Sequence, residues 1–514
     1  MPLLPPRPKI AAGPSRRVYD VIVVGGQLAG AMSAALLAKR GYRVLLVEHD
    51  GMGHGYEHGD YLLPYAPFVA QQLRTMPLVE EAFAELGLTT TIQRSLKSNI
   101  PDLQLILPKD RIDFPHDEGR RLAELTRAFG AARAESLNAL FKSATVQHEQ
   151  TDAFFKDRPD LPPNSFVEGW GLKKVLRKHP HLDASFSIQD GDDPVSHLLL
   201  ALLPFVTYVA APRGPLPLTR TLSQVLKSST RYPGSREGLR ELLCRRLIDL
   251  GGDLLWRESS ESSIVESLAF EGGKLVGVQI LRSENLYRSS YMIVATDSAA
   301  LRRLIPDKKT QRKLIELLDL SVVKQFLFTV NWVVTADAVP RGMGDLLLFD
   351  TGDLDLEPLL VQVHPARRIG SKAEDESLRV VTSGVFVQAT ARDLGEGYLK
   401  LLADRMSSHL ARLMPFAKDH LLLSSAPYLD AGGVRGARLL PHPLYEVDTE
   451  DFLGITGLTQ QTPLKNLFLA SRETLPGLGL EGEFLAGARA AKLIQETMNK
   501  RDPLKRRGIW RASR

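Results

Sequence analysis

A glycine-rich turn near the start of the chain carries residue types that can bind a phosphate-containing cofactor. Gly25, Gly26 and Gly30 follow an apolar run, and Glu48 stands further along the chain. Glycines let the backbone approach a pyrophosphate, and the following helix N-terminus attracts it, while an acidic residue about 20 positions on accepts the ribose hydroxyls. Gln27 replaces the second glycine of the usual G-x-G-x-x-G motif, so the pattern predicts a dinucleotide site with one altered position.

A second glycine-rich junction lies near the other end of the chain. The apolar run 467–470 leads into Gly477, Gly479 and Gly482, and a helix of small residues is expected over 483–498. This second helix N-terminus could face the same cofactor. The alternative is a tight turn that needs the backbone angles of glycine. Two such junctions in one chain favour the binding interpretation.

Other reactive residue types form weaker patterns. His49, His54 and His58 could bind a metal, but the glycines between them argue against a helix, and no carboxylate–histidine cluster completes a site. Cys244 is expected to be a small core residue. No Ser/His/Asp or Cys/His arrangement for nucleophilic catalysis is visible, so no catalytic residue is assigned.

Buried strands and a helix are expected to position the first glycine-rich turn. The runs 21–24 and 43–47 are typical of parallel strands buried on both faces, and 29–40 between them predicts a helix that ends at Gly41. A turn, helix and strand follow over 232–256, with Ser235 and Glu237 as candidate capping residues. A third buried strand ends in the small residues Ala295 and Thr296, which again indicates a ligand at the carboxyl edge of the sheet.

The predicted fold is α/β, with a Rossmann-type lobe that binds the cofactor and a discontinuous α+β substrate lobe. The second lobe combines helices with a mixed or antiparallel sheet, because several of its segments alternate with the period of a strand. These strand segments are 321–334, 345–349, 359–363 and 378–388. The predicted boundaries are 18–75, 222–305 and 440–499 for the first lobe, 76–221 and 306–439 for the second, 1–17 for a flexible leader and 500–514 for a basic tail.

Composition limits the functional classes. The chain has 514 residues, 44% of them hydrophobic, and a net charge of only +5, so we expect a large core and no nucleic-acid partner. The single cysteine excludes a disulfide framework, and we expect a cytoplasmic protein. The apolar segment 197–211 is too short to span a membrane. It predicts a buried helix and strand, with a membrane contact or lipid tunnel as the alternative, and the basic tail with Trp510 could also contact a membrane surface.

The chain resembles the phytoene desaturase-like flavoproteins within the amine oxidase-like FAD superfamily. The resemblance rests on 21–48, on Tyr232-PGS and its helix, on Ile293-VATDS and on the segment 454–490. It implies bound FAD and oxidation or rearrangement of a hydrophobic substrate such as a polyene or isoprenoid, by hydride transfer to the flavin. It also implies frequent contact with a membrane surface. The resemblance does not indicate an oligomeric state.

The resemblance also assigns roles to residues. Gly25, Gly26 and Gly30, with Ala29 beside them, would face the pyrophosphate. Glu48, followed by His49, would bind the ribose, and Ala295 and Thr296 would lie near the adenine. Thr474, Gly477, Gly479 and Gly482 would lie by the flavin and ribityl chain. Tyr445, His442 and Glu473 are polar groups near the flavin end.

The chain departs from the family pattern at several positions. Besides Gln27, the Gly-Gly-Arg expected after the second strand is absent, the serine-rich segment around Glu261 replaces an apolar contact, and Arg472 and Glu473 stand near the ribityl chain. Arg472 could pair with phosphate or block the pocket. Two alternatives to an FAD-dependent oxidoreductase follow: a catalytically silent relative that serves in binding or assembly, and an amine oxidase.

Overall fold

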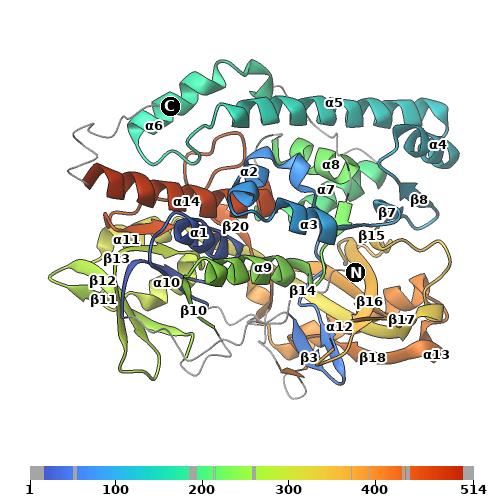
Figure 1. Ribbon diagram of the computed structural model, residues 1–514. Coiled ribbons are helices and arrows are strands. Elements are labelled where there is room, and N and C mark those ends of the chain that lie inside the picture. The colour runs from blue at the N-terminus through green and yellow to red at the C-terminus, as the bar shows by residue number, and fades with distance from the viewer. Residues whose placement is uncertain are drawn as a thin grey trace.

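The computed structural model describes residues 17–49, 55–183, 194–211, 214, 216–227, 229–256, 262–371, 373–392, 394–430, 434–435 and 440–501. Almost all of the predicted leader and basic tail lies outside these residues, as do His54, Glu261 and the part of the serine-rich segment that precedes Glu261. The described chain forms two large sheets with helices packed on them (Figure 1).

The first sheet has the strand order β10-β2-β1-β13-β12-β11, and β21 pairs with β13. Its strands are β1 (Val18–Val24), β2 (Val44–Val47), β10 (Asp253–Leu255), β11 (Val265–Glu271), β12 (Lys274–Ile280), β13 (Leu286–Val294) and β21 (Leu467–Leu469). Parallel pairing joins β10 to β2, β2 to β1, β1 to β13 and β13 to β21. Antiparallel pairing joins β11 to β12 and β12 to β13. The predicted Rossmann-type sheet is confirmed.

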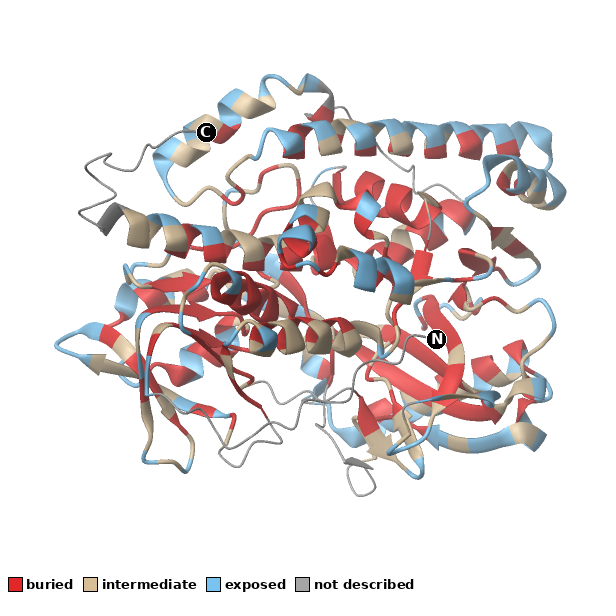
Figure 2. Cartoon of the chain, viewed as in Figure 1, coloured by how far each residue is buried: buried red, intermediate tan, exposed pale blue. Residues whose placement is uncertain are grey.

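Both faces of this sheet are covered, which explains the continuous apolar run in β1. Val21 and Val23 face one core, which is completed by α1 (Leu28–Lys39), α9 (Ser235–Asp249) and α14 (Gly479–Arg501). Ile22 and Val24 face the opposite core with α10 (Ser298–Leu304) and α11 (Arg312–Leu318). Successive residues from Val21 to Val24 therefore alternate between two apolar environments, so this part of the strand is continuously apolar. The buried colour along these elements is visible in Figure 2.

The second sheet has the order β18-β14-β17-β16-β15-β7-β8, and β20 pairs with β14. Its strands are β7 (Leu103–Ile106), β8 (Arg111–Phe114), β14 (Ser321–Thr335), β15 (Leu346–Phe349), β16 (Leu359–Arg367), β17 (Glu374–Gln388), β18 (Leu421–Ser425) and β20 (Leu444–Val447). All pairs are antiparallel except β15 with β7. The predicted mixed or antiparallel sheet is confirmed. The segment 440–499 supplies β20 to this sheet and β21 to the first.

Helices cover both faces of the second sheet. One face packs against α4 (Glu118–Phe129), α5 (Ala131–Lys156), α7 (Pro194–Val206) and α8 (Leu216–Lys227), and the other against α12 (Glu396–Leu413) and α13 (Ala417–His420). The remaining helices are α2 (Pro77–Glu85), α3 (Thr89–Ser95) and α6 (Phe166–Leu176), and the short strands are β3 (Tyr56–His58), β4 (Tyr61–Leu63), β5 (Ala70–Gln71), β6 (Lys97–Ser98), β9 (Ser229–Arg231) and β19 (Val434–Arg435).

The segment 197–211 contains the predicted buried helix, but an isolated β-bridge stands where a strand was predicted. Leu198, Leu199 and Leu202 of α7 are buried, and Val209 forms a β-bridge with Tyr445. Among the residues that the structure describes, no helix is both long and apolar enough to cross a bilayer. Cys244 is buried as predicted, and burial raises the pKa of its thiol to about 12.

The start of α9 differs from the prediction. Gly234, with a left-handed φ of 74°, precedes the helix, and no side chain caps it, so the expected capping by Ser235 and Glu237 is wrong. The reason is the turn itself: Ser235 also has a positive φ of 55°, which places its side chain outside capping geometry. Glu237 lines a cavity instead.

Candidate functional site

A cavity of about 390 Å³ lies at the N-terminal end of α1 and is lined by residues from around both sheets. One part of its lining, here called the aromatic wall, consists of Tyr65, Phe68, Phe205, Tyr208, Phe326 and Tyr445. The charged residues of the lining are Arg236, Glu237, Asp297, Arg303, Arg392 and Arg472. The cavity therefore combines aromatic rings with an excess of guanidinium groups.

The turn between β1 and α1 has the geometry that the glycine motif predicts. Gly25 has a φ of 104°, and its N–H donates to the carbonyl of Val47 at 2.9 Å. A Cβ on Gly30 would lie 2.1 Å from the Gly25 carbonyl oxygen and 2.9 Å from the side chain of Ala295. Gly25 and Gly30 are therefore required for the turn and for the close approach of α1 to β13.

The N-terminus of α1 already has an anionic partner. The backbone N–H of Leu28, the first residue of α1, donates to Oε1 of Glu483 at 3.1 Å. Glu483 belongs to α14, and only 1% of it is exposed. The first N–H groups of a helix and its dipole attract anions. A carboxylate of the protein thus lies at the position where a dinucleotide fold binds phosphate.

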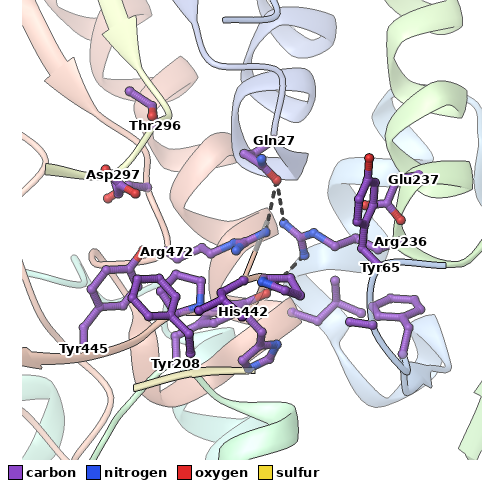
Figure 3. Close-up of a pocket in the computed structure, with 18 of the residues that line it drawn as sticks. Gln27, Tyr65, Tyr208, Arg236, Glu237, Thr296, Asp297, His442, Tyr445 and Arg472 are labelled. Carbon is purple, nitrogen blue, oxygen red and sulfur yellow. Dashed lines mark hydrogen bonds between the residues drawn. The ribbon is translucent and has the colours of Figure 1, made fainter. Parts of the chain in front are cut away.

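Two arginines and a tyrosine enclose this carboxylate. Arg236 of α9 donates to Glu483, and the hydroxyl of Tyr208 donates to Glu483 Oε2 at 3.1 Å. The Nε of Arg472 lies 3.7 Å from Glu483 Oε2. Gln27 links both arginines, because its Oε1 accepts from Arg236 at 3.3 Å and from Arg472 at 3.1 Å, as Figure 3 shows. We call Gln27, Tyr208, Arg236, Arg472 and Glu483 the closure cluster.

The charges in the closure cluster stabilise the ionised carboxylate. Burial by itself would raise the pKa of Glu483, but Arg236 and Arg472 outweigh it and hold that pKa below its usual range. Burial raises the pKa of Tyr208, so its hydroxyl keeps the proton that it donates to Glu483. An ionised buried carboxylate needs such partners, and here each oxygen has a hydrogen bond.

The acidic residue at the end of β2 is also engaged. Glu48 is 3% exposed, and its Oε1 accepts from Arg240 at 2.5 Å. The Arg240 guanidinium lies 5.9 Å from the ring centroid of Trp256. Arg240 and Arg236 are one helical turn apart on α9, so a single helix supplies a cation to Glu48 and a cation to Glu483.

The structure places five predicted residues at contacts between backbone segments, away from the cavity lining. A Cβ on Gly477, Gly479 or Gly482 would lie 2.2, 1.8 or 2.2 Å from the carbonyl oxygens of Gly454, Val206 and Leu475, respectively. The carbonyl of Ala29 faces α14, where a Cβ on Gly487 would lie 2.3 Å from it. Thr474 is fully buried. These contacts give the glycines a packing reason, and their assignment to a cofactor stays a prediction.

His49, Ala295 and Thr296 do line the cavity, beside Gln27 and Arg472. His49 has a φ of 51°, and its Nδ1 accepts from the N–H of Val265 at 3.1 Å. Burial and the nearby Arg303 lower the pKa of His49, so its ring is neutral. Its contact with a ribose likewise stays a prediction.

Glu473 lies behind the cavity, at the start of α10. It accepts hydrogen bonds from the N–H and hydroxyl of Ser298 at 2.8 and 3.0 Å and from the hydroxyl of Ser321 at 2.7 Å. Burial and the neighbouring Asp297 raise the pKa of Glu473 to about 7. A proton is therefore bound more tightly here than in the unfolded chain.

Replacing Glu473 by glutamine should stabilise the protein more at pH 8 than at pH 5. Because the folded pKa is raised to about 7 from a reference of 4.5, the wild-type chain loses stability as the pH rises through that interval, whereas glutamine does not titrate. The loss is on the order of 3 kcal/mol. Melting temperatures of both proteins at the two pH values test this. The same difference in melting temperature between the two proteins at pH 5 and at pH 8 would contradict this prediction.

The sequence alone did not identify most of the closure cluster. Gln27 and Arg472 were visible as departures from a motif, but Arg236, Tyr208 and Glu483 were not singled out. One signal was available, because Glu481 and Glu483 are acids among the glycines and apolar residues at the start of α14. Such residues are seldom buried unless they are paired.

Comparisons with known proteins agree with this fold. A family model for an NAD(P)-binding Rossmann-like domain matches residues 23–86. An oxidoreductase from Methanosarcina mazei superposes with a TM-score of 0.54 at 12% identity, covering 91% of this chain and 99% of that one. A variant of putrescine oxidase from a redesign of its cofactor binding gives 0.53 at 15% identity, covering 93% and 99%. A protein from Pyrococcus furiosus gives 0.53 at 14% identity, covering 92% and 97%.

No curated protein matches the sequence. The structural similarities extend over nearly the whole chain, so both sheets and their helices take part in them. The chain therefore has the fold of the flavin-dependent oxidoreductases, with a Rossmann-like domain at its start.

FAD, which this fold implies, does not fit the arrangement of the described residues. Its pyrophosphate would need the N-terminus of α1, which binds Glu483, and the glycine position that the Gln27 side chain now fills. Its ribose would need Glu48, whose carboxylate is paired with Arg240. The chain's own side chains therefore bind two of the groups that would hold the cofactor, the N–H of Leu28 and Oε1 of Glu48.

Proposed function

We propose that the protein is a small-molecule-binding protein built on the fold of flavin-dependent oxidoreductases and that it holds no resident FAD. The observation that carries this proposal is the hydrogen bond from the first N–H of α1 to Glu483. A pyrophosphate at that position would meet a carboxylate that is ionised, because its pKa is lowered. The carboxylate would have to leave the Leu28 N–H before a phosphate oxygen could accept from it, so the bound cofactor would be disfavoured.

The cavity beside the closure cluster supports a binding role. Its volume of about 390 Å³ falls within the range of sites that hold small molecules. The aromatic wall offers apolar surface, which suits the hydrophobic ligand expected from the sequence.

The absorption spectrum of the purified full-length protein tests the proposal. We expect no flavin bands, no flavin released on denaturation and no rise in melting temperature with excess FAD, because a ligand that binds only the folded state would stabilise it. The expressing cells must make enough riboflavin to load a co-expressed flavoprotein, which serves as the control. Stoichiometric bound flavin would overturn the proposal.

A second candidate is an FAD-dependent oxidoreductase that acts on a hydrophobic substrate, as the sequence resemblance implies. Its support is the similarity of fold to an oxidoreductase and to putrescine oxidase over nearly the full chain. The same spectrum decides between the candidates, because this one requires a yellow protein. A polyene or isoprenoid substrate and a contact with a membrane surface belong to this second proposal.

An amine oxidase is the least favoured alternative. Four arginines and two acidic residues line the cavity, and one of the acids, Asp297, accepts a hydrogen bond from the N–H of Ala300 at 2.7 Å. A protonated amine would therefore enter a site with an excess of positive charge, which repels it.

A further inference from the structure

We propose that the cavity binds an organic carboxylate with a flat apolar body, the carboxylate on Arg392 and the body along the aromatic wall. This inference rests on the proposed function and adds the chemical class of the ligand. It follows from three features of the cavity lining. These are an arginine that stacks on a ring and forms no ion pair among the described residues, an excess of positive charge, and several aromatic rings.

Arg392 is a cation held in place without using its hydrogen-bond donors. Its guanidinium lies 3.8 Å from the ring centroid of Phe326, which belongs to β14 and to the aromatic wall. Within the described part of the chain, Arg392 forms no ion pair and no hydrogen bond. Stacking on a ring uses the face of a guanidinium and leaves its N–H edge available, and that edge matches the two oxygens of a carboxylate. Arg392 is exposed, and its N–H edge is therefore available to an anion that enters the cavity from solution.

The other charges of the lining also favour an anion. Arg303 makes no ion pair or hydrogen bond among the described residues, whereas the carboxylate of Asp297 is engaged at the start of α10. Arg236 and Arg472 are balanced in part by Glu483. Glu237 opposes the trend, but burial raises its pKa. The lining as a whole keeps an excess of positive charge, which a ligand can neutralise.

The apolar body would find further rings in the cavity lining, at Phe205, Tyr208 and His442. Phe386, which lies outside the lining, supports two of these rings, because its centroid is 4.9 Å from that of Phe205 and 5.6 Å from that of His442. The His442 ring stacks near Tyr208 at 4.8 Å. Burial and Arg472 lower the pKa of His442 to about 3, so this ring is neutral and contributes surface rather than charge. Flat conjugated ligands pack well against such rings.

Two fluorescent probes that differ only in charge test the inference. Pyrenebutyrate carries a carboxylate at neutral pH, and pyrenebutanol is the corresponding alcohol. We expect the wild-type protein to bind pyrenebutyrate about tenfold more tightly, since a charge-assisted hydrogen bond contributes this much. Arg392→Gln should remove that preference and leave the affinity for pyrenebutanol unchanged. Phe326→Leu should weaken both probes.

Arg341→Gln is the matched control, because Arg341 is exposed and lies outside the cavity lining. It should leave both affinities unchanged. Equal affinity of the wild-type protein for the two probes, or equal losses in the Arg392 and Arg341 variants, would overturn the inference. The probe titrations use protein whose absorption spectrum has first been checked for bound flavin. Bound flavin would refute the proposed function, whereas absence of a charge preference in flavin-free protein would refute the ligand class alone.

Discussion

The double variant Gln27→Gly, Glu483→Ala is expected to bind FAD with an affinity at least a hundredfold above that of the wild-type chain. The first change restores the glycine of the motif, and the second removes the carboxylate from the N-terminus of α1. Arg236 and Arg472 then lose their internal anion and become donors for a pyrophosphate. Quenching of flavin fluorescence and a rise in melting temperature with added FAD measure the gain.

Two controls show whether charge at the helix N-terminus is the cause. Gln27→Gly alone keeps the carboxylate and should gain little affinity. Riboflavin, which has the ring system but no phosphate, should bind the double variant no better than the wild type. A double variant that stays unable to bind FAD while remaining folded would show that other features of the site exclude the cofactor.

Replacing Arg220 by methionine should lower the stability of the protein by about 3–5 kcal/mol, because it leaves a buried charge without its partner. Arg220 is 2% exposed and donates to Glu481 through Nε and Nη2 at 2.5 and 2.6 Å. It also donates to Asp152 at 2.9 Å and lies 4.9 Å from the ring of Phe155. One side chain thus ties α8 to α5 and α14. The shift of the urea midpoint measures the loss.

The loss of stability in Arg220→Met should come from the buried carboxylate of Glu481, which is left without its cation, rather than from lost packing. Arg220→Met combined with Glu481→Leu should recover most of the stability, since a buried ion pair can be replaced by apolar residues at little cost. Arg312→Met, which breaks an exposed pair with Glu316, should change stability by no more than about 0.5 kcal/mol. A double variant as unstable as Arg220→Met alone would refute this explanation.

The elements of the first sheet were predictable because their information is local. The apolar run in β1, the small residues of α1 and the glycines between them stand next to one another in the sequence. The antiparallel sheet was predictable in the same way, from the alternation within β14 and β17. The parallel pairing of β7 with β15 was not predictable, because it joins strands that are far apart along the chain.

The closure cluster is non-local, and one sequence cannot show it. Leu28 and Glu483 are 455 residues apart, and Arg236 and Glu483 are 247 apart. A single sequence displays charged residues but not which of them meet. Gln27 could be recognised because it breaks a motif with fixed spacing, whereas the reason for Gln27 lies in two arginines from α9 and from the segment after β21.

The hydrogen bond between Glu483 and the start of α1 also bears on how the chain matures. In a protein that relies on a bound nucleotide, α1 and α14 can settle fully only after the nucleotide arrives. Here α14 carries the carboxylate that binds the N-terminus of α1. The anion is therefore in place as soon as the chain has folded. Under the proposed function, production of the finished protein would be independent of how much riboflavin the cell can obtain.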